Sequence, residues 1–465
     1  MNWQDRVNAF TDDRDRADGR DAPERTWSAP AGEIRGWLDG DVARATGIPY
    51  ATAERFGRPV PAEPSAEPVE ARRWAPACPQ VPMDILEKLL WHPDAGMEED
   101  EACLNLSVTV PAHADPAGSL PVMVWIHGGS YTAGAGDAHV FEAAPIVSEQ
   151  DVIVVSVTYR LSILGYLGWE GGRPANLGLL DQIEALRWVR RNIAAFGGDP
   201  ENVTVFGQSA GADAAAHLMI ARGAEGLFAK AILQSAPLGI MPNRSRMTAL
   251  MAREASRTED NAPLAEILGS EERVARWALP FGLRGAMPFG VQYGFDPLPA
   301  EEELDDAWRD AASRVQIMIG HTAREASLFT GEVPGMHRFA RQARIGEAIS
   351  EGLVTALTRR IYADPAHAFA ARHADAGGRG VQYVIDWGPE GSPYKAAHTI
   401  ELPLLLGSRP AWEKAALIAG AVWEDVEPQG MMLRSLWARF ARTGTVELES
   451  YPGLIRFGPL ETPPD

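Results

Sequence analysis

The sequence predicts an α/β fold in which a mostly parallel central sheet is flanked by helices on both faces. From residue 120 onward, apolar runs of strand length alternate with patterns of helical spacing, which is typical of strand–helix–strand units. Residues 121–126 and 152–159 are continuous apolar and β-branched runs. Such runs indicate strands that are buried on both faces of a parallel sheet.

The elements expected along the chain follow from these patterns. Ile183, Leu186, Val189 and Ile193 recur at helical spacing, and a Gly-Gly pair ends that helix. Glycine-interrupted short strands are expected first, over residues 32–51. Further strands are expected at residues 203–206, 229–236, 315–320 and 381–387, and helices at residues 179–196, 210–222, 345–360 and 430–442.

The domain organisation is expected to be simple. Residues 1–30 are charged and polar, and they predict an N-terminal arm. No Pro/Ser/Gly-rich linker separates the periodic segments that follow. Residues 31–465 are therefore expected to form a single α/β domain, although 465 residues would allow more than one.

Charge and hydropathy exclude several classes of partner. The net charge of −20 and a pI near 5.0 oppose nucleic-acid binding, which needs clustered arginine and lysine. No apolar run reaches the length of about 18 residues that spans a bilayer. The charged start resembles no signal peptide. We expect a cytoplasmic monomer or homodimer that acts on a small molecule, without nucleic acid or membrane as a partner.

Only two cysteines occur, Cys78 and Cys103. Two thiols cannot form a disulfide scaffold or a cysteine-rich metal site. The reducing conditions of the cytosol favour two buried thiols. We expect no metal, and no cofactor is expected either.

The candidate nucleophile is Ser209, in the segment Gly207-Gln208-Ser209-Ala210-Gly211. An apolar strand precedes this segment, and a helix rich in small residues follows it. This is the G-x-S-x-G turn between strand and helix, in which the glycines make room for a strained turn that exposes the serine hydroxyl. Because Ala210 opens the helix, its N–H can point at a developing oxyanion.

A second motif, residues 125–131, stands at the end of an earlier buried strand and reads Trp-Ile-His-Gly-Gly-Ser-Tyr. Glycines there let backbone N–H groups approach a substrate carbonyl closely, which would complete an oxyanion hole. His127 lies inside the turn, where we expect it to hold the loop by hydrogen bonds rather than to act in catalysis.

Together these motifs resemble the type-B carboxylesterase family, which includes bacterial para-nitrobenzyl-type esterases and the cholinesterases. The resemblance covers roughly residues 30–455 and implies the α/β-hydrolase fold. Residues 196–211 match the family's nucleophile signature along its whole length. Further agreement lies at residues 47–51, 122–129, 176–193 and 227–238.

A second family signature is only partly kept, at residues 101–107, where Ala102 and Asn105 depart from it. The cysteine of that motif often pairs in relatives with one about 25 residues earlier, and Cys78 stands at the matching place before Cys103. The resemblance therefore implies that these two cysteines are neighbours in space.

The resemblance also implies a triad in the chain order serine, acid, histidine. Residues 320–326 resemble the family's acid segment, with Glu325 as the counterpart, and residues 395–403 resemble its histidine segment, with His398 as the counterpart. Both are expected on loops past the carboxyl ends of strands. Other candidates are Glu401 or Asp386 as the group that orients the histidine, and His321 as the histidine itself.

These residues predict a serine carboxylesterase that acts through an acyl-enzyme intermediate. His398 would accept the Ser209 proton, and Glu325 would orient the imidazole. The resemblance implies that Gly129, Ser130 and Ala210 donate N–H groups to the oxyanion. Gly128 would keep the loop tight.

The substrate is less well specified than the reaction. Gln208 replaces the acidic residue of many relatives beside the nucleophile, which gives no support to choline-like cationic esters. Two alternatives stay open: a biosynthetic acyltransferase or thioesterase with the same triad, and a catalytically silent binding homologue.

Overall fold

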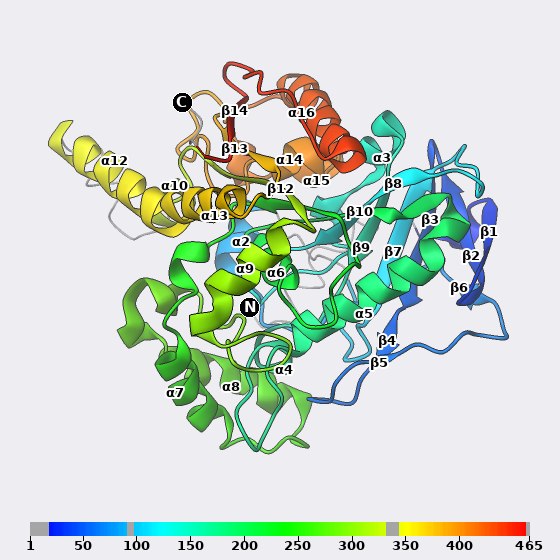
Figure 1. Ribbon diagram of the computed structural model, residues 1–465, viewed down its shortest axis with the longest axis horizontal. Coiled ribbons are helices and arrows are strands. Elements are labelled where there is room, and N and C mark those ends of the chain that lie inside the picture. The colour runs from blue at the N-terminus through cyan, green and yellow to red at the C-terminus, as the bar shows by residue number, and fades with distance from the viewer. Residues whose placement is uncertain (1–17, 91–96, 332–343, 462–465) are drawn as a thin grey trace.

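The computed structural model describes residues 18–90, 97–331 and 344–461 (Figure 1). Within these residues, twelve strands form one sheet in the order β1-β2-β3-β7-β9-β8-β10-β11-β12-β13-β14, with β6 beside β2. The first 17 residues of the expected N-terminal arm lie outside the described residues.

The centre of the sheet is parallel and its two ends are antiparallel. The parallel strands are β9 (Ile153–Val157), β8 (Leu120–Ile126), β10 (Gly198–Gln208), β11 (Lys230–Gln234), β12 (Gln316–Thr322) and β13 (Gly380–Ile385). Antiparallel pairing adds β1 (Glu24–Ala29), β2 (Gly32–Asp39), β3 (Val42–Pro49) and β7 (Asn105–Pro111) at one end and β14 (Ile455–Pro459) at the other. β6 (Val69–Glu70) is parallel to β2, while β4 (Ala51–Thr52) and β5 (Val60–Pro61) form a separate pair.

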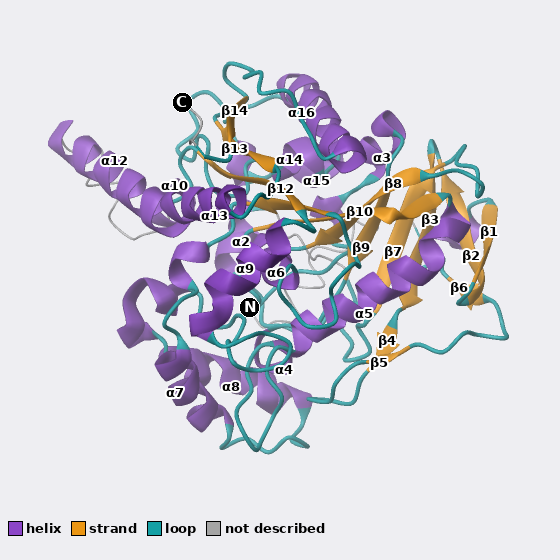
Figure 2. Cartoon of the chain, in the orientation of Figure 1, coloured by secondary structure: helices purple, strands orange, loops and turns teal. Residues whose placement is uncertain are grey.

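Helices cover both faces of the sheet (Figure 2). Alternate residues of the central strands belong to two separate apolar cores. In β8, for example, Val122, Val124 and Ile126 join one core, whereas Met123 and Trp125 join the other. The helices of the first core are α4 (Ser162–Gly165), α5 (Leu177–Asn192), α6 (Ala210–Leu218), α7 (Ser245–Ala255), α8 (Leu264–Arg276), α9 (Leu304–Ala312) and α13 (Asp364–Asp375). Those of the second are α2 (Asp84–Leu89), α3 (Ala144–Gln150), α10 (Ser327–Gly331), α14 (Leu402–Leu405), α15 (Arg409–Trp412) and α16 (Trp423–Thr443).

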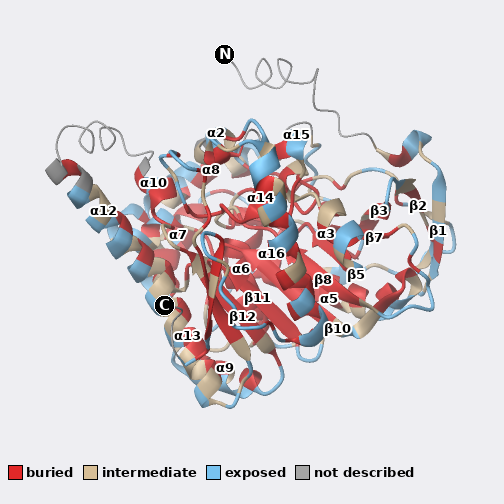
Figure 3. Cartoon of the chain, turned by 90° about the horizontal axis from the view of Figure 1, so that it is seen from above, coloured by how far each residue is buried: buried red, intermediate tan, exposed pale blue. Residues whose placement is uncertain are grey.

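Burial explains why the central strands are continuous apolar runs. Every residue of β9 and β11 is buried, and Figure 3 shows β8, β11 and β12 enclosed between the helices. Strands covered on both faces have no solvent side on which polar residues would be favoured. The predicted α/β class, with helices on both faces of a sheet that is parallel at its centre, is confirmed.

Several elements differ from their predicted bounds. β1 lies inside the segment assigned to the polar arm, because this edge strand buries little besides Trp27 and therefore reads as polar. α6 ends at Leu218 rather than at residue 222, and the long helical pattern near residues 345–360 becomes α12 (Arg344–Thr358). β7 and β14 have no counterpart among the predicted strands.

The described part of the chain contains no helix that is both long enough and apolar enough to cross a membrane. Within those same residues, no group of three or more His, Cys, Asp or Glu side chains is arranged to hold a metal ion.

Candidate active site

Ser209 lies in a sharp turn between β10 and α6, at the carboxyl end of the parallel strands (Figure 1). Its backbone has φ 58° and ψ −124°, a conformation that costs a non-glycine residue on the order of 1–3 kcal/mol. Hydrogen bonds hold it there: the Ser209 N–H donates to Gln234 O at 2.8 Å, and the Asp213 N–H donates to Ser209 O at 3.0 Å. The side chain therefore projects from the strand end at the start of a helix.

The two glycines of this turn are required by close packing against β8. A Cβ on Gly207 would lie 2.7 Å from Ile126 O, and a Cβ on Gly211 would lie 2.0 Å from the same atom. Both distances are shorter than any van der Waals contact. The G-x-S-x-G pattern therefore reflects the approach of two backbones as well as the strained turn itself.

The loop after β8 runs directly beside the serine. A Cβ on Gly128 would lie 3.3 Å from Ser209 Cβ, and Gly129 has φ 104°, a conformation that favours glycine. Ser130 and Tyr131 follow with φ 57° and 61°, so two consecutive non-glycine residues are left-handed. The loop therefore passes close to Ser209, at the start of α6.

His127 supports this loop through hydrogen bonds. It is fully buried, its Nδ1 lies 2.8 Å from Gly128 O, and its own carbonyl accepts a hydrogen bond from the Tyr159 hydroxyl at 2.6 Å. Burial lowers its pKa to about 4, so the ring is neutral at physiological pH. These contacts agree with the supporting role expected for His127.

Glu325 and His398 lie in direct contact. His398 Nδ1 is 2.5 Å from Glu325 Oε2, and Glu325 Oε1 accepts the Thr322 N–H at 2.7 Å. Burial raises the pKa of Glu325, but its interactions with the His398 ring, together with smaller ones from Ser235 and His321, hold the pKa below its usual range. The carboxylate is therefore charged and fixes the imidazole with Nδ1–H toward it.

The other candidates of the histidine and acid segments make different contacts. Asp386 pairs with Arg456, and His321 Nδ1 bonds to Thr322 O. Glu401 Oε1 accepts a long hydrogen bond from Gln234 Nε2 at 3.5 Å, and its Oε2 has no partner. Burial and the nearby Glu325 raise the pKa of Glu401 to about 7. Of the three carboxylates that could orient His398, the geometry favours Glu325.

The second ring nitrogen of His398 meets Gln208 rather than the serine. Gln208 Nε2 lies 3.3 Å from His398 Nε2, and between the two described residues Ser209 and His398 there is no hydrogen bond. Hydrogen bonds between catalytic groups often tighten only when substrate is bound. The ring itself lies between Tyr362, at 5.0 Å between centroids, and the partly exposed Phe329, at 5.6 Å.

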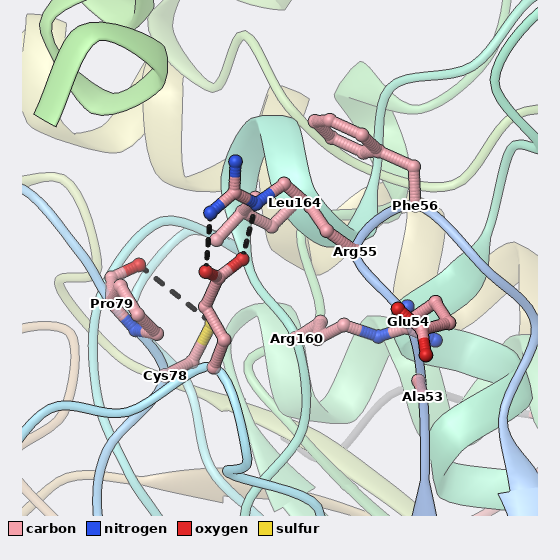
Figure 4. Close-up of a pocket in the computed structure, with 9 residues that line it drawn as sticks. Ala53, Glu54, Arg55, Phe56, Cys78, Pro79, Arg160 and Leu164 are labelled. Carbon is pink, nitrogen blue, oxygen red and sulfur yellow. Dashed lines mark hydrogen bonds and ion pairs between the residues drawn. The ribbon is translucent and has the colours of Figure 1, made fainter. Parts of the chain in front are cut away.

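A small cavity stands apart from these residues (Figure 4). It measures about 20 Å³ and is lined by residues that include Phe56, Cys78 and Arg160. That volume holds one water molecule and excludes an ester substrate.

Cys78 and Cys103 are both buried and free. The pKa of the Cys78 thiol is raised, mainly by a hydrogen bond with the Cys103 thiol and secondly by burial. The two cysteines are thus neighbours, as the family resemblance implies.

Comparison with known proteins identifies the family. A sequence profile described as the carboxylesterase family matches residues 24–345, which is more than half of the chain. The chain belongs to the carboxylesterase family.

Two relatives extend the match over almost the whole esterase. A probable N-octanoylanthranilate hydrolase of Rhodococcus erythropolis is 36% identical, covering 92% of this chain and 95% of the relative. The para-nitrobenzyl esterase of Bacillus subtilis is 32% identical, with 90% of each chain covered.

A solved structure supports the fold. The structure of a thermophilic PNB esterase superimposes with a TM-score of 0.77 at 29% identity, covering 93% of this chain and 97% of that one. The esterase therefore has the α/β-hydrolase fold, and it is a carboxylic-ester hydrolase, as the sequence predicts.

Three contacts of the candidate site were not predicted from the sequence. These are the Gln208–His398 contact, the Thr322 N–H on Glu325, and the buried Tyr131 hydroxyl beneath the loop. Gln208 was visible as a departure from the family pattern. The other two depend on backbone placement and burial, for which the sequence carries no local signal.

Proposed function

We propose that this esterase hydrolyses carboxylic esters through a triad of Ser209, His398 and Glu325 and an acyl-enzyme intermediate. The observation that carries the proposal is the 2.5 Å contact between His398 Nδ1 and Glu325 Oε2, in a chain whose Ser209 occupies a strained turn at the same sheet edge. This contact leaves Nε2 of the ring as the free base.

In the first half-reaction, Ser209 Oγ attacks the ester carbonyl carbon while His398 Nε2 takes the hydroxyl proton. The carbonyl oxygen becomes an oxyanion, and the N–H groups of Gly129, Ser130 and Ala210 bind it. Gly128 keeps the loop against the serine. The tetrahedral intermediate then collapses, the bond to the alkoxide breaks, and the alkoxide leaves with the proton from His398 as an alcohol.

In the second half-reaction, water takes the place of the alcohol. His398 Nε2 removes a proton from water, and the resulting hydroxide attacks the acyl carbon. Collapse of the second tetrahedral intermediate returns the proton to Ser209 Oγ and releases a carboxylic acid. Glu325 stabilises the imidazolium in both halves and does not itself become protonated. Gln208 must release Nε2 before either step begins.

Substitution of the serine tests the triad. We expect Ser209→Ala to lower turnover of p-nitrophenyl butyrate by about six orders of magnitude, because the members of a triad act as a unit. Its thermal melt should stay near that of the wild type. Ser270→Ala removes an equally buried hydroxyl, from α8, and should keep full activity. Retained turnover in Ser209→Ala would overturn the proposal.

A second candidate activity is hydrolysis of N-acyl anthranilates. The relative from Rhodococcus erythropolis, similar over nearly both whole chains, is named for N-octanoylanthranilate. The same triad can cleave an amide, with an amine as the leaving group. The test compares release of anthranilate from N-octanoylanthranilate with hydrolysis of p-nitrophenyl octanoate. Absence of anthranilate at enzyme concentrations that consume the ester would reject this activity.

Acyl transfer, thioester cleavage and a silent site are separated by two measurements. A fluorophosphonate that labels Ser209 identifies a competent nucleophile, and a silent binding homologue would not label. Product analysis with methanol present separates a hydrolase, which yields mainly acid, from an acyltransferase, which yields mainly methyl ester. An octanoyl thioester in the same assay tests thioesterase activity. We further propose a cytoplasmic monomer or homodimer, and cell fractionation and sedimentation would test both.

A further inference from the structure

The proposed oxyanion hole is built from two separate elements, and its geometry depends on how they are held together. Gly129 and Ser130 belong to the loop after β8, whereas Ala210 is the first residue of α6. Donors to an oxyanion act only when they converge on one point at hydrogen-bond distance. A contact that ties the loop to the helix would therefore affect the rate directly.

The loop cannot keep its shape without such support. Ser130 and Tyr131 both have left-handed backbones, which L-residues with a side chain adopt only when their surroundings force them to. Ser162 N–H donates to Tyr131 O at 2.6 Å, which holds one side of the loop. The Thr132 and Ala133 N–H groups donate to Gly129 O and support the loop from within, and the Tyr131 side chain adds a contact that leads out of the loop.

The Tyr131 hydroxyl reaches α6. It is fully buried and donates to Asp213 Oδ2 at 2.6 Å. Asp213 lies in the first turn of α6, and its N–H donates to Ser209 O. The bond thus joins the residue after Ser130 to the helical turn that carries Ser209 and Ala210. A hydrogen bond from a neutral hydroxyl to a carboxylate is short and strong, which suits a fixed clamp.

Burying the carboxylate of Asp213 costs free energy of folding. Asp213 is fully buried in a helix whose other residues are small or apolar apart from His217, and its Oδ1 has no hydrogen-bond partner. No arginine or lysine of the described chain forms an ion pair with it. His217 Nδ1 lies 3.6 Å away, and the buried Arg244 acts on it only at longer range. If residue 213 only filled space in the core, alanine, which occupies the neighbouring positions, would serve as well.

We propose that Asp213 is a positioning residue that, through the Tyr131 hydroxyl, holds the oxyanion loop in register with the nucleophile helix. This inference rests on the proposed function, because it concerns the same oxyanion hole. It predicts that the clamp affects stabilisation of the transition state and leaves substrate binding and the histidine untouched.

The test removes the hydroxyl and measures the oxyanion hole directly. Tyr131→Phe should lower kcat for p-nitrophenyl butyrate by about ten- to a hundredfold, less than the loss of a whole donor. KM should stay within twofold. The inhibition constant of an octyl trifluoromethyl ketone, whose hemiketal oxyanion occupies the hole, should rise by the same factor as kcat falls. The pH profile of kcat/KM should not move.

Tyr166→Phe is the matched control. Tyr166 is equally buried, its ring centroid lies 4.3 Å from that of Tyr131, and its hydroxyl is bonded to Gln182 rather than to α6. This variant also removes a buried hydroxyl, one that accepts a bond from Gln182 Nε2 at 3.1 Å, without loosening the proposed clamp, so kcat and ketone inhibition should stay near wild type. Equal losses of kcat in Tyr131→Phe and Tyr166→Phe, or a rise in KM with kcat unchanged, would overturn the inference.

Substitution of the acid closes the test. Asp213→Asn keeps an oxygen that can accept the Tyr131 hydroxyl and should retain more activity than Asp213→Leu. The double variant Tyr131→Phe/Asp213→Asn should be no worse than the worse single variant, since both changes break one bond. It also carries the test if an unpaired buried carboxylate prevents Tyr131→Phe from folding. Wild-type labelling of Ser209 by fluorophosphonate is measured first: failure there rejects the proposed function, whereas labelled wild type with unaffected variants rejects only the clamp.

Discussion

Glu325 and Glu401 are both fully buried glutamates close to His398, yet their surroundings shift their pKa values in opposite directions. Glu325 has a hydrogen-bond partner on each oxygen, the Thr322 N–H and the His398 ring. Glu401 has one weak contact and an oxygen without a partner. Burial penalises both charges, and the number and charge of their partners explain why the two pKa values shift in opposite directions.

This difference separates two functions of a buried carboxyl group. Glu325 is charged throughout the neutral range and can stabilise an imidazolium at any moment of the reaction. Glu401, with a pKa of about 7, is partly protonated under the same conditions, and its ionisation is opposed by the charge on Glu325. A group in that state cannot supply a steady counter-charge.

The largest expected effect comes from neutralising the charged member of the pair. Glu325→Gln should lower kcat for p-nitrophenyl butyrate by about four orders of magnitude, because the imidazole loses both its orientation and its counter-charge. Asp386→Asn, which alters another carboxylate of the same sheet edge that is paired with Arg456, should stay within a few-fold of wild type. Steady-state kinetics of both variants measure this. A small loss in Glu325→Gln would mean that Glu401 can take over the role.

The contrast between these two glutamates could not be predicted from the sequence. Glu401 stands three residues from His398 and Glu325 stands 73 residues away, so proximity along the chain favours the wrong carboxylate. The contact with Glu325 arises because β12 ends beside β13 and the loop before α14 returns to the same sheet edge. That geometry is set by long-range pairing, and the family resemblance, rather than spacing, identified Glu325.

Local features were predicted well. The turn at Ser209 combines a β-branched strand, two glycines and a small-residue helix within a few residues, and each of these is visible in the sequence. β7 was missed although Leu106, Val108 and Val110 alternate with polar residues. The alternation indicates a half-exposed strand, whereas β7 is buried along its whole length between β3 and β9. Its neighbours, rather than its own residues, determine its position in the sheet.

A second prediction concerns stability and tests Glu401. A raised carboxyl pKa means that the folded state binds more protons than the unfolded state between pH 4.5 and about 7. The stabilisation is complete below pH 4.5 and is lost as the pH rises through about 7. The cost at pH 8 is on the order of 3 kcal/mol for a displacement of this size. Glu401→Gln should therefore be more stable than wild type at pH 8 and nearly equal at pH 5, measured by urea unfolding at each pH.

Glu271 in α8 provides a matched control. It is buried, and burial raises its pKa to about 7 as well, but it belongs to none of the segments that carry the proposed triad. Glu271→Gln should flatten the dependence of stability on pH in the same direction and leave kcat unchanged. If Glu401→Gln shows no gain in stability at pH 8, Glu401 is charged in the folded protein, and the contrast with Glu325 disappears.

The smallest expected effect comes from placing a third carboxylate on the opposite side of the ring. Gln208 Nε2 lies 3.3 Å from His398 Nε2, so Gln208→Glu would set a negative charge beside the nitrogen that must accept the serine proton. An opposite charge at that distance favours the imidazolium, and the acid limb of the kcat/KM profile should move up by about one pH unit. Activity at pH values on the acid limb should fall by up to about tenfold, because more of the enzyme carries a protonated ring.

Gln208→Met separates charge from hydrogen bonding at the same position. It removes the amide that occupies His398 Nε2 without adding a charge, so the acid limb should not move, and kcat should rise or stay level because Ser209 no longer competes for the ring nitrogen. Identical pH profiles for the Glu and Met variants would show that the charge of residue 208 does not reach His398. In that case Glu325 alone controls the protonation of the His398 ring. The Gln208 amide then only occupies His398 Nε2 until substrate is bound.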